Sequence, residues 1–199
     1  MNSTYKNIKD TRTFADVLDY IKSIRNTNDI IVFLDWDDNI ADPDTDEIIE
    51  PKETKALIDY MKENRIMFNI ITGRFYNTAC NNRTRKLKQM ERNILKTIHP
   101  VLMDLDVDVS SFQTEEAKNT FYKLYDENQI CIGILYMGII FSGYKGLAMK
   151  DFMKQAGLNQ SKIIFVDDYE QYLYEATTNF PGIKAYRRFK PLKTDNAFN

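Results

Sequence analysis

Residues 30–39 read Ile-Ile-Val-Phe-Leu-Asp-Trp-Asp-Asp-Asn, an apolar run that passes directly into three carboxylates. A short, continuous apolar run of mostly β-branched or aromatic residues is typical of a strand buried on both faces of a parallel sheet. Ligands of such sheets bind at the carboxyl ends of the strands, so Asp35, Asp37 and Asp38 lie where chemistry is expected. Like charges gathered there are costly unless a cation or hydrogen-bond donors compensate them. The stretch therefore indicates a metal site.

Length and composition fit one well-buried domain. The chain has 199 residues, is 43% hydrophobic and 28% charged, and carries a formal net charge of -2. This composition is typical neither of a nucleic-acid-binding protein nor of a membrane protein. Its polar N-terminus has no signal-peptide core, and no window approaches the roughly 18 apolar residues of a membrane span. Cys80 and Cys131 lack a C-x-x-C pairing and fit a reducing compartment better than a disulfide scaffold, and a single histidine argues against zinc chemistry. We therefore expect a cytoplasmic protein.

Two further apolar runs repeat the pattern of the first. Residues 66–71 predict a strand that passes into Thr72-Gly73-Arg74, and residues 162–166 predict one that passes into Asp167-Asp168. Helical spacing and end signals predict helices over 13–25, 52–64, 145–157 and 169–178. This alternation is typical of an α/β fold in which a parallel sheet carries helices on both faces.

The middle and the end of the chain are harder to interpret. A helix rich in lysine and arginine is expected over 81–97, closed by His99-Pro100, and its basic face suits either solvent or an anionic ligand. Acids alternating with apolar residues predict a strand over 103–109, followed by a helix over 114–128. Residues 130–141 hold two apolar runs, either a hairpin or two strands joined by a loop. A short strand over 183–186 and a basic tail from Arg187 complete the chain.

Several of these residues also have simpler interpretations. Thr72 could cap the following helix, and Lys145 could be an exposed lysine at a helix start. The spacing of Asp42, Asp44 and Asp46 is similar to that of a calcium loop, but the glycine at the sixth position and the distal glutamate are missing. An acidic, solvated turn is the better interpretation of that segment.

Taken together, the chain presents carboxylates, a hydroxyl, a lysine and again carboxylates, and this order resembles the haloacid dehalogenase-like superfamily of phosphatases and phosphotransferases. The matching residues, which span about 30–178, are Asp35-Trp36-Asp37, Thr72, Lys145 and Asp167-Asp168. The resemblance implies a Rossmann-like, haloacid dehalogenase-like domain over 1–199. It also implies an inserted cap-like or substrate-specificity region at about 75–138, between the second and third motifs.

The resemblance further implies a Mg²⁺-dependent phosphomonoester hydrolase that acts through an aspartyl-phosphate. Asp35 would be the nucleophile and Asp37 the general acid and base, whereas Thr72, Gly73 and Lys145 would bind the substrate phosphate. Mg²⁺ would be held by Asp35, Asp37, Asp167 and Asp168. The substrate would be a phosphorylated small molecule or the phosphorylated end of a macromolecule, and nothing in the sequence supports a nucleic acid in particular.

Two alternatives stay open beside this hypothesis. The superfamily usually has threonine or valine where this chain has Asn39, so the protein could be a catalytically inactive relative that serves as a binding or interaction module. A response-regulator receiver also uses acids, threonine and lysine on a parallel sheet. There, however, the acidic pair comes first, whereas Asp167-Asp168 follows Thr72 and Lys145 here, and this order argues against a receiver.

Overall fold

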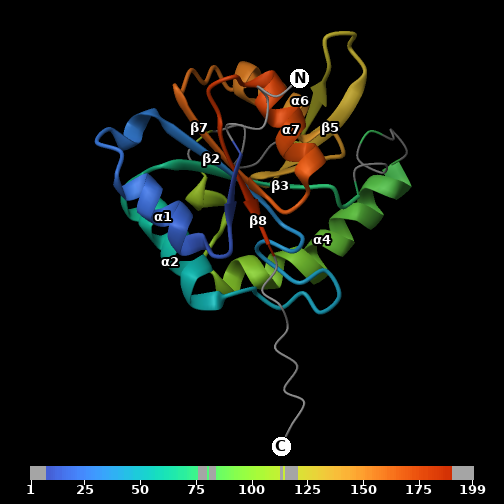
Figure 1. Ribbon diagram of the computed structural model, residues 1–199. Coiled ribbons are helices and arrows are strands. Elements are labelled where there is room, and N and C mark those ends of the chain that lie inside the picture. Colours follow the sequence, from blue (N-terminus) through green and yellow to red (C-terminus); the bar gives the residue numbers. More distant parts are fainter. Residues whose placement is uncertain (1–7, 76–79, 81–83, 113, 115–120, 190–199) are drawn as a thin grey trace, which may run out of the picture.

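The computed structural model describes residues 8–75, 80, 84–112, 114 and 121–189 (Figure 1). Within this part of the chain, eight strands form one sheet in the order β1-β8-β7-β2-β3-β6-β5-β4. Neighbouring strands are parallel from β1 to β6, and β5 and β4 extend the sheet with antiparallel pairings. The strands are β1 (Ile8–Thr11), β2 (Ile30–Asp35), β3 (Met67–Thr72), β4 (Tyr122–Tyr125), β5 (Cys131–Tyr136), β6 (Ile139–Ser142), β7 (Lys162–Asp167) and β8 (Lys184–Arg188).

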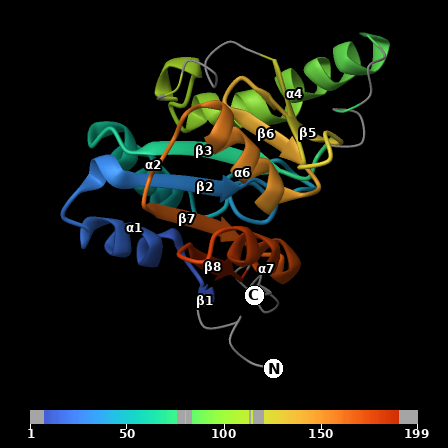
Figure 2. The ribbon, with the colours of Figure 1, turned by 90° about the horizontal axis from the view of Figure 1, so that it is seen from above.

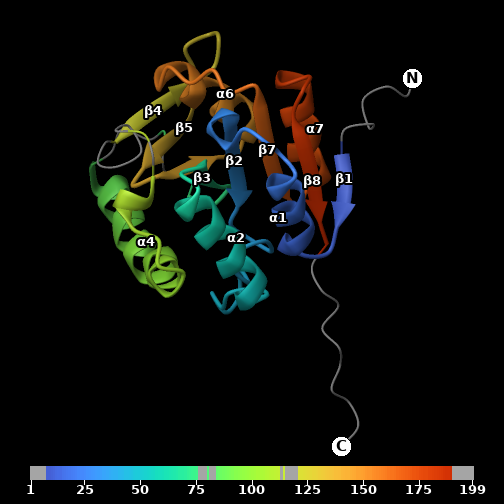
Figure 3. The same ribbon diagram turned by 90° about the vertical axis from the view of Figure 1, so that its left-hand side faces the viewer.

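Helices cover both faces of this sheet, so the predicted α/β class is confirmed (Figure 2, Figure 3). One hydrophobic cluster joins the sheet to α1, α2 and α4, and a second joins the opposite face to α6 and α7. The sequence already predicts all five of these helices, although it ends α4 too early. Their bounds are α1 (Phe14–Lys22), α2 (Pro51–Glu63), α4 (Thr84–Asp104), α6 (Lys145–Gln155) and α7 (Glu170–Asn179).

Strand β2 lies at the centre of the sheet, between β3 and β7. All of its residues are buried, and they alternate between the two cores: Val32 and Leu34 belong to the first, whereas Ile31 and Phe33 belong to the second. A strand that contributes side chains to both faces must be apolar throughout, which is why this segment shows no alternation with polar residues. The prediction of a doubly buried strand is therefore confirmed.

The two apolar runs over 130–141 form a hairpin, which settles the choice left open by the sequence. Strands β5 and β6 pair in antiparallel fashion around Met137 and Gly138, whose φ angles are 50° and 78°. Positive φ at both central residues is the geometry of a tight two-residue hairpin turn. A side chain at Gly138 would meet the ring of Phe112 at 2.1 Å, so this position also requires glycine for space.

Helix α4 continues beyond the end that the sequence pattern predicts. It runs through Pro100 to Asp104, so the expected end at His99-Pro100 and the expected strand over 103–109 are both wrong. Ile94, Ile98 and Val101 bury against the sheet at helical spacing. Burial of this stripe outweighs the local alternation of acids and apolar residues. Residues 81–83 of the predicted helix lie outside the described part, and Lys88, Arg92 and Lys96 are exposed along α4.

The helix expected over 114–128 is also wrong where the structure describes it. Tyr122–Tyr125 is strand β4, which pairs with β5 and buries Leu124, whereas residues 115–120 lie outside the described residues. The described parts of 75–138 therefore extend the sheet with β4 and β5 and cover it with α4. That this region selects a substrate stays a prediction.

Two corrections concern the cysteines and the C-terminal segment. Cys80 and Cys131 form a disulfide with their Cα atoms 5.7 Å apart, so the preference for free cysteines is wrong. The two residues are 51 positions apart, and only the tertiary fold brings β5 next to the segment that follows β3. Arg187 and Arg188 belong to β8 rather than to a basic tail, and residues 190–199 lie outside the description. None of the described helices is long and apolar enough to cross a bilayer.

Candidate active site

Three of the predicted site residues stand at the carboxyl ends of three adjacent parallel strands. Asp35 ends β2, Thr72 ends β3 and Asp167 ends β7, and β2 is hydrogen-bonded to both other strands. Because parallel strands end at the same edge of a sheet, these side chains meet there. Lys145 is the first residue of α6, which follows β6 at that edge. The topology thus explains why distant parts of the sequence converge.

Lys145 lies between two of the buried carboxylates. Its Nζ donates to Asp35 Oδ1 at 2.5 Å and to Asp167 Oδ2 at 2.7 Å, and all three side chains are almost completely buried. Burial alone would lower the pKa of Lys145, but Asp35 and Asp167 together raise it above its usual value. The lysine is therefore a fixed cation within the site, and its interpretation as an exposed helix-start residue is wrong.

The carboxylates of the cluster carry more negative charge than this single ammonium neutralises. Burial raises the pKa of Asp35 well above its usual value, and repulsion from Asp167 raises it further. Burial likewise raises the pKa of Asp167 to about 6 and that of the half-buried Asp168 above its usual value. A second cation near these groups would favour their ionised forms. We call Asp35, Asp167 and Asp168 the carboxylate cluster.

The donor atoms of the carboxylate cluster fit a divalent metal ion. One oxygen from each of its three members lies within 4.8 Å of the others. Asn39 adds a buried Oδ1 atom that has no hydrogen-bond partner among the described residues. Hard oxygen ligands of this kind suit Mg²⁺, which prefers carboxylates and carbonyl groups. The three carboxylates therefore fit the predicted cation on their chemistry. The Asp37 carboxylate, also predicted as a ligand, does not belong to this cluster and pairs with Arg74.

Asn39 holds the turn that follows β2 against the carboxylate cluster. Its Nδ2 group lies 3.0 Å from Asp35 Oδ2, 3.2 Å from the carbonyl oxygen of Asp37 and 3.4 Å from Asp168 Oδ1. A threonine at this position would offer one donor instead of the amide's two. The residue that departs from the superfamily pattern thus supports the local geometry.

Asp37 is held by groups from the end of β3. Thr72 Oγ1 lies 3.3 Å from Asp37 Oδ2, and the same hydroxyl accepts a hydrogen bond from the backbone N–H of Arg74 at 3.0 Å. Arg74 Nε donates to Asp37 Oδ1 at 2.6 Å, and its Nη1 donates to Asp46 Oδ1 at 2.9 Å. Gly73 lies between Thr72 and Arg74 in the sequence. Two of the three residues predicted to bind phosphate, Thr72 and Gly73, are therefore next to Asp37.

The sequence interpretation gave no role to two arginines that contact this site. In the sequence Arg74 stands out only as the last residue of the Thr72-Gly73-Arg74 turn, and its position two residues after Thr72 is the signal for its role. Arg188 is completely buried; it donates to the carbonyl oxygen of Asn39 and pairs with Glu50 Oε2 at 2.8 Å. The sequence pattern places Arg188 in a basic tail, because no local feature distinguishes it from an exposed arginine.

The acidic segment after β2 forms a turn, as the simpler interpretation expects, but Asp42 in this turn is buried rather than solvated. Asp42 Oδ1 accepts from the backbone N–H groups of Asp44 and Thr45 at 3.0 and 3.3 Å, and Asp46 pairs with Arg74. These carboxylates are therefore engaged with protein donors. The segment also anchors the arginine that contacts Asp37.

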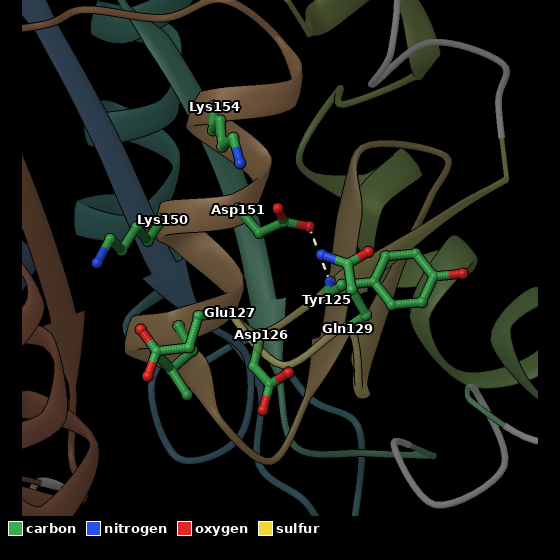
Figure 4. A pocket seen from close by; sticks show the side chains of 8 residues that line it. Tyr125, Asp126, Glu127, Gln129, Lys150, Asp151 and Lys154 are labelled. Carbon is green, nitrogen blue, oxygen red and sulfur yellow. Dashed lines mark hydrogen bonds between the residues drawn. The ribbon is translucent and has the colours of Figure 1, made fainter.

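A separate pocket of about 280 Å³ lies between the β4–β5 turn and the outer side of α6 (Figure 4). Its charged side chains are of both signs, and Asp151 accepts a hydrogen bond from the backbone N–H of Tyr125 at 2.8 Å. None of the buried, unpartnered polar atoms found in the described residues belongs to its lining. We assign it no chemistry. Its lining residues are Tyr125, Asp126, Glu127, Gln129, Leu147, Lys150, Asp151 and Lys154.

Comparisons of the chain with family models, with curated proteins and with solved structures give no match. Any statement about function therefore rests on the chemistry of the residues that meet at the ends of β2, β3 and β7. The likeness to the haloacid dehalogenase-like superfamily stays a hypothesis based on the order and types of those residues.

Proposed function

We propose that the protein is a Mg²⁺-dependent phosphomonoester hydrolase of the haloacid dehalogenase-like kind. The observation that carries this proposal is the position of the Lys145 ammonium between Asp35 and Asp167, with Asp168 beside them. A buried lysine among several carboxylates adds little to the stability of the fold, because the cost of removing so many charges from water offsets their attraction. Stability alone therefore does not account for this arrangement. The arrangement is well suited to a phosphoryl group, whose charge is spread over several oxygens.

In the first step, an oxygen of Asp35 attacks the phosphorus of the bound monoester. The bond between phosphorus and the ester oxygen breaks, and Asp37 gives its proton to the departing alcohol. In the second step, Asp37 takes a proton from water, and the resulting hydroxide attacks the phosphorus. The bond to Asp35 then breaks, and inorganic phosphate leaves. Splitting the displacement in two lets one carboxylate act as acid and then as base.

Other residues of the site hold the transferring group. Lys145 and the Thr72 hydroxyl, together with the backbone at Gly73, would bind phosphoryl oxygens and offset their charge. Mg²⁺ held by the carboxylate cluster and by the main-chain carbonyl of Asp37 would supply further charge neutralisation. Arg74 fixes the direction of the Asp37 carboxylate through its 2.6 Å hydrogen bond. Positioning of this kind lowers the barrier because the reacting groups are already aligned.

A catalytically inactive binding module is the second candidate function, and Asn39 is the observation that favours it. The Asn39 amide donates to both Asp35 and Asp168 and so competes with other partners of these carboxylates. If this competition limits turnover, Asn39→Thr should raise the rate of phosphate release. An unmeasurable rate in both forms would favour the inactive module.

The test is hydrolysis of p-nitrophenyl phosphate by the full chain, with Mg²⁺ and with EDTA. We expect turnover that EDTA abolishes, and loss of turnover in Asp35→Asn, which removes the nucleophile and nearly preserves its shape. The exposed Asp104→Asn exchange on α4 serves as the matched control and should keep the parent rate. Equal rates for the parent and Asp35→Asn would refute the proposed mechanism.

A further inference from the structure

Two tyrosines of the segment after β7 form an aromatic contact next to the candidate site. The ring centroids of Tyr169 and Tyr172 lie 5.2 Å apart at an interplanar angle of 65°, an edge-on arrangement. Such contacts hold both rings in fixed orientations. We call Tyr169 and Tyr172 the tyrosine pair.

The tyrosine pair is tied to the site at both residues. The backbone N–H of Tyr169 donates to Asp167 Oδ1 at 2.8 Å, so this residue is fixed to the carboxylate cluster. The ring of Tyr172 covers the Lys145 ammonium, with 4.3 Å between Nζ and the ring centroid. A side chain built on Gly73 would lie 3.6 Å from the Tyr172 hydroxyl, which places that hydroxyl over the turn after β3. Tyr172 thus spans from α7 to the phosphate-binding turn.

The outer member of the pair remains open to solvent. Tyr169 is 53% exposed, and within the part of the chain that the structure describes its hydroxyl donates only to Gln171 Oε1, at 3.4 Å. Its side chain does not cap α7, so neither the helix start nor the core depends on it. A large exposed ring held rigidly beside a charged site provides a flat surface on which another ring can stack.

We propose that the tyrosine pair binds the nucleobase of a nucleoside monophosphate whose phosphate lies at Lys145. This inference rests on the proposed function, and it names the class of substrate. The order of contacts favours a nucleotide over an aryl phosphate. In an aryl phosphate the ring is bonded directly to the ester oxygen. Here the ring over the Lys145 ammonium is that of Tyr172, and the exposed Tyr169 ring contacts Tyr172. In a nucleoside monophosphate the pentose lies between base and phosphate, so the base can stack on Tyr169 while the phosphate lies at Lys145.

The first test compares hydrolysis of adenosine 5′-monophosphate with that of glycerol phosphate, which has no ring. Tyr169→Ala should raise the KM for the nucleotide about tenfold, in line with the loss of one base-stacking contact, and leave kcat and both constants for glycerol phosphate unchanged. Tyr169→Phe keeps the ring and should behave as the parent. Tyr174→Ala, an exposed tyrosine of the same helix, is the matched control. Equal effects of Tyr169→Ala on both substrates, or no effect on either, would overturn the inference.

A second measurement does not depend on turnover. Calorimetric titration with adenosine 5′-monophosphate should give a Kd that Tyr169→Ala raises about tenfold and Tyr169→Phe leaves unchanged. Binding that depends on Tyr169 without any hydrolysis would support the tyrosine pair and refute the phosphatase. If the protein hydrolysed glycerol phosphate but its Kd for the nucleotide did not change in Tyr169→Ala, the nucleobase-binding role of the tyrosine pair would be refuted. The proposed phosphatase activity would still be supported.

Discussion

Replacing Lys145 by methionine should strongly destabilise the metal-free protein at pH 7. The lysine is 2% exposed, and its ammonium group lies 2.5 Å from Asp35 and 2.7 Å from Asp167. Methionine fills a similar volume with a flexible, unbranched chain, so the change removes the charge without leaving a large cavity. The two carboxylates would then be buried without the cation that now separates them.

The expected loss of unfolding free energy is about 3–5 kcal/mol, the usual cost of removing one partner from a buried ion pair. For a chain of this size it corresponds to a fall in Tm of about 6–20 °C, since each kcal/mol shifts Tm by about 2–4 °C. The loss should be smaller at pH 5. Burial already raises the pKa of Asp167 to about 6, so protonation relieves the unpaired charge there.

Urea unfolding of the metal-free protein in EDTA measures this difference at both pH values. The double variant Lys145→Met/Asp35→Asn is the matched comparison, because it removes one of the two charges that the single variant leaves unpaired. It should recover about half of the lost stability. A Lys145→Met variant as stable as the parent at pH 7 would refute the account of the lysine as the compensating cation.

The other predictions concern Arg74, Asp167 and the disulfide. Arg74→Ala should lower kcat about tenfold with little change in KM, because the Asp37 carboxylate loses its 2.6 Å hydrogen bond to Arg74 Nε. Arg74→Lys should recover part of this loss. An unchanged kcat for Arg74→Ala would contradict the positioning role of Arg74. The pKa of Asp167 is raised to about 6, above the value of about 3.9 expected in the unfolded chain, so the folded state holds the proton more tightly. Metal-free stability should therefore fall as pH rises from about 4 to about 6. This loss of unfolding free energy, up to about 3 kcal/mol, should be absent in Asp167→Asn. If urea unfolding showed the same pH dependence for the parent and for Asp167→Asn, the role of Asp167 would be refuted. Reduction of Cys80–Cys131, whose residues are 51 positions apart, should lower the unfolding free energy by about 2–4 kcal/mol, and two titratable thiols in the untreated protein would contradict the bond.

The parts of the fold that follow from the sequence are those fixed by burial on both faces. The runs that end at Asp35, Thr72 and Asp167 are short and rich in β-branched residues, which favours inner strands over buried helices, and parallel strands bring their ends together. Lys145 could be placed near them only through the order of the motifs, because nothing local distinguishes a buried lysine from an exposed one. Its contacts with two carboxylates depend on the packed structure.

The errors occur where local patterns compete with tertiary contacts. Residues 103–109 alternate like a strand, but the apolar stripe of α4 that ends at Leu102 is buried against the sheet, and this burial decides the conformation. The disulfide and Arg188 depend on neighbours far away in sequence, which a single chain does not reveal. Tyr172 resembles any helical tyrosine until its ring is placed over Lys145.

The central claim is that Asp35 carries the phosphoryl group during turnover, and mass spectrometry of a stalled enzyme tests it most directly. Asp37→Asn removes the base that activates water, whereas p-nitrophenolate leaves readily without a proton, so this variant should accumulate the intermediate in the presence of Mg²⁺. After acid quenching we predict one added phosphoryl group on the peptide that contains Asp35, absent when Asp35 is also changed to asparagine. Consumption of the substrate by a variant whose Asp35 peptide stays unmodified would contradict the account.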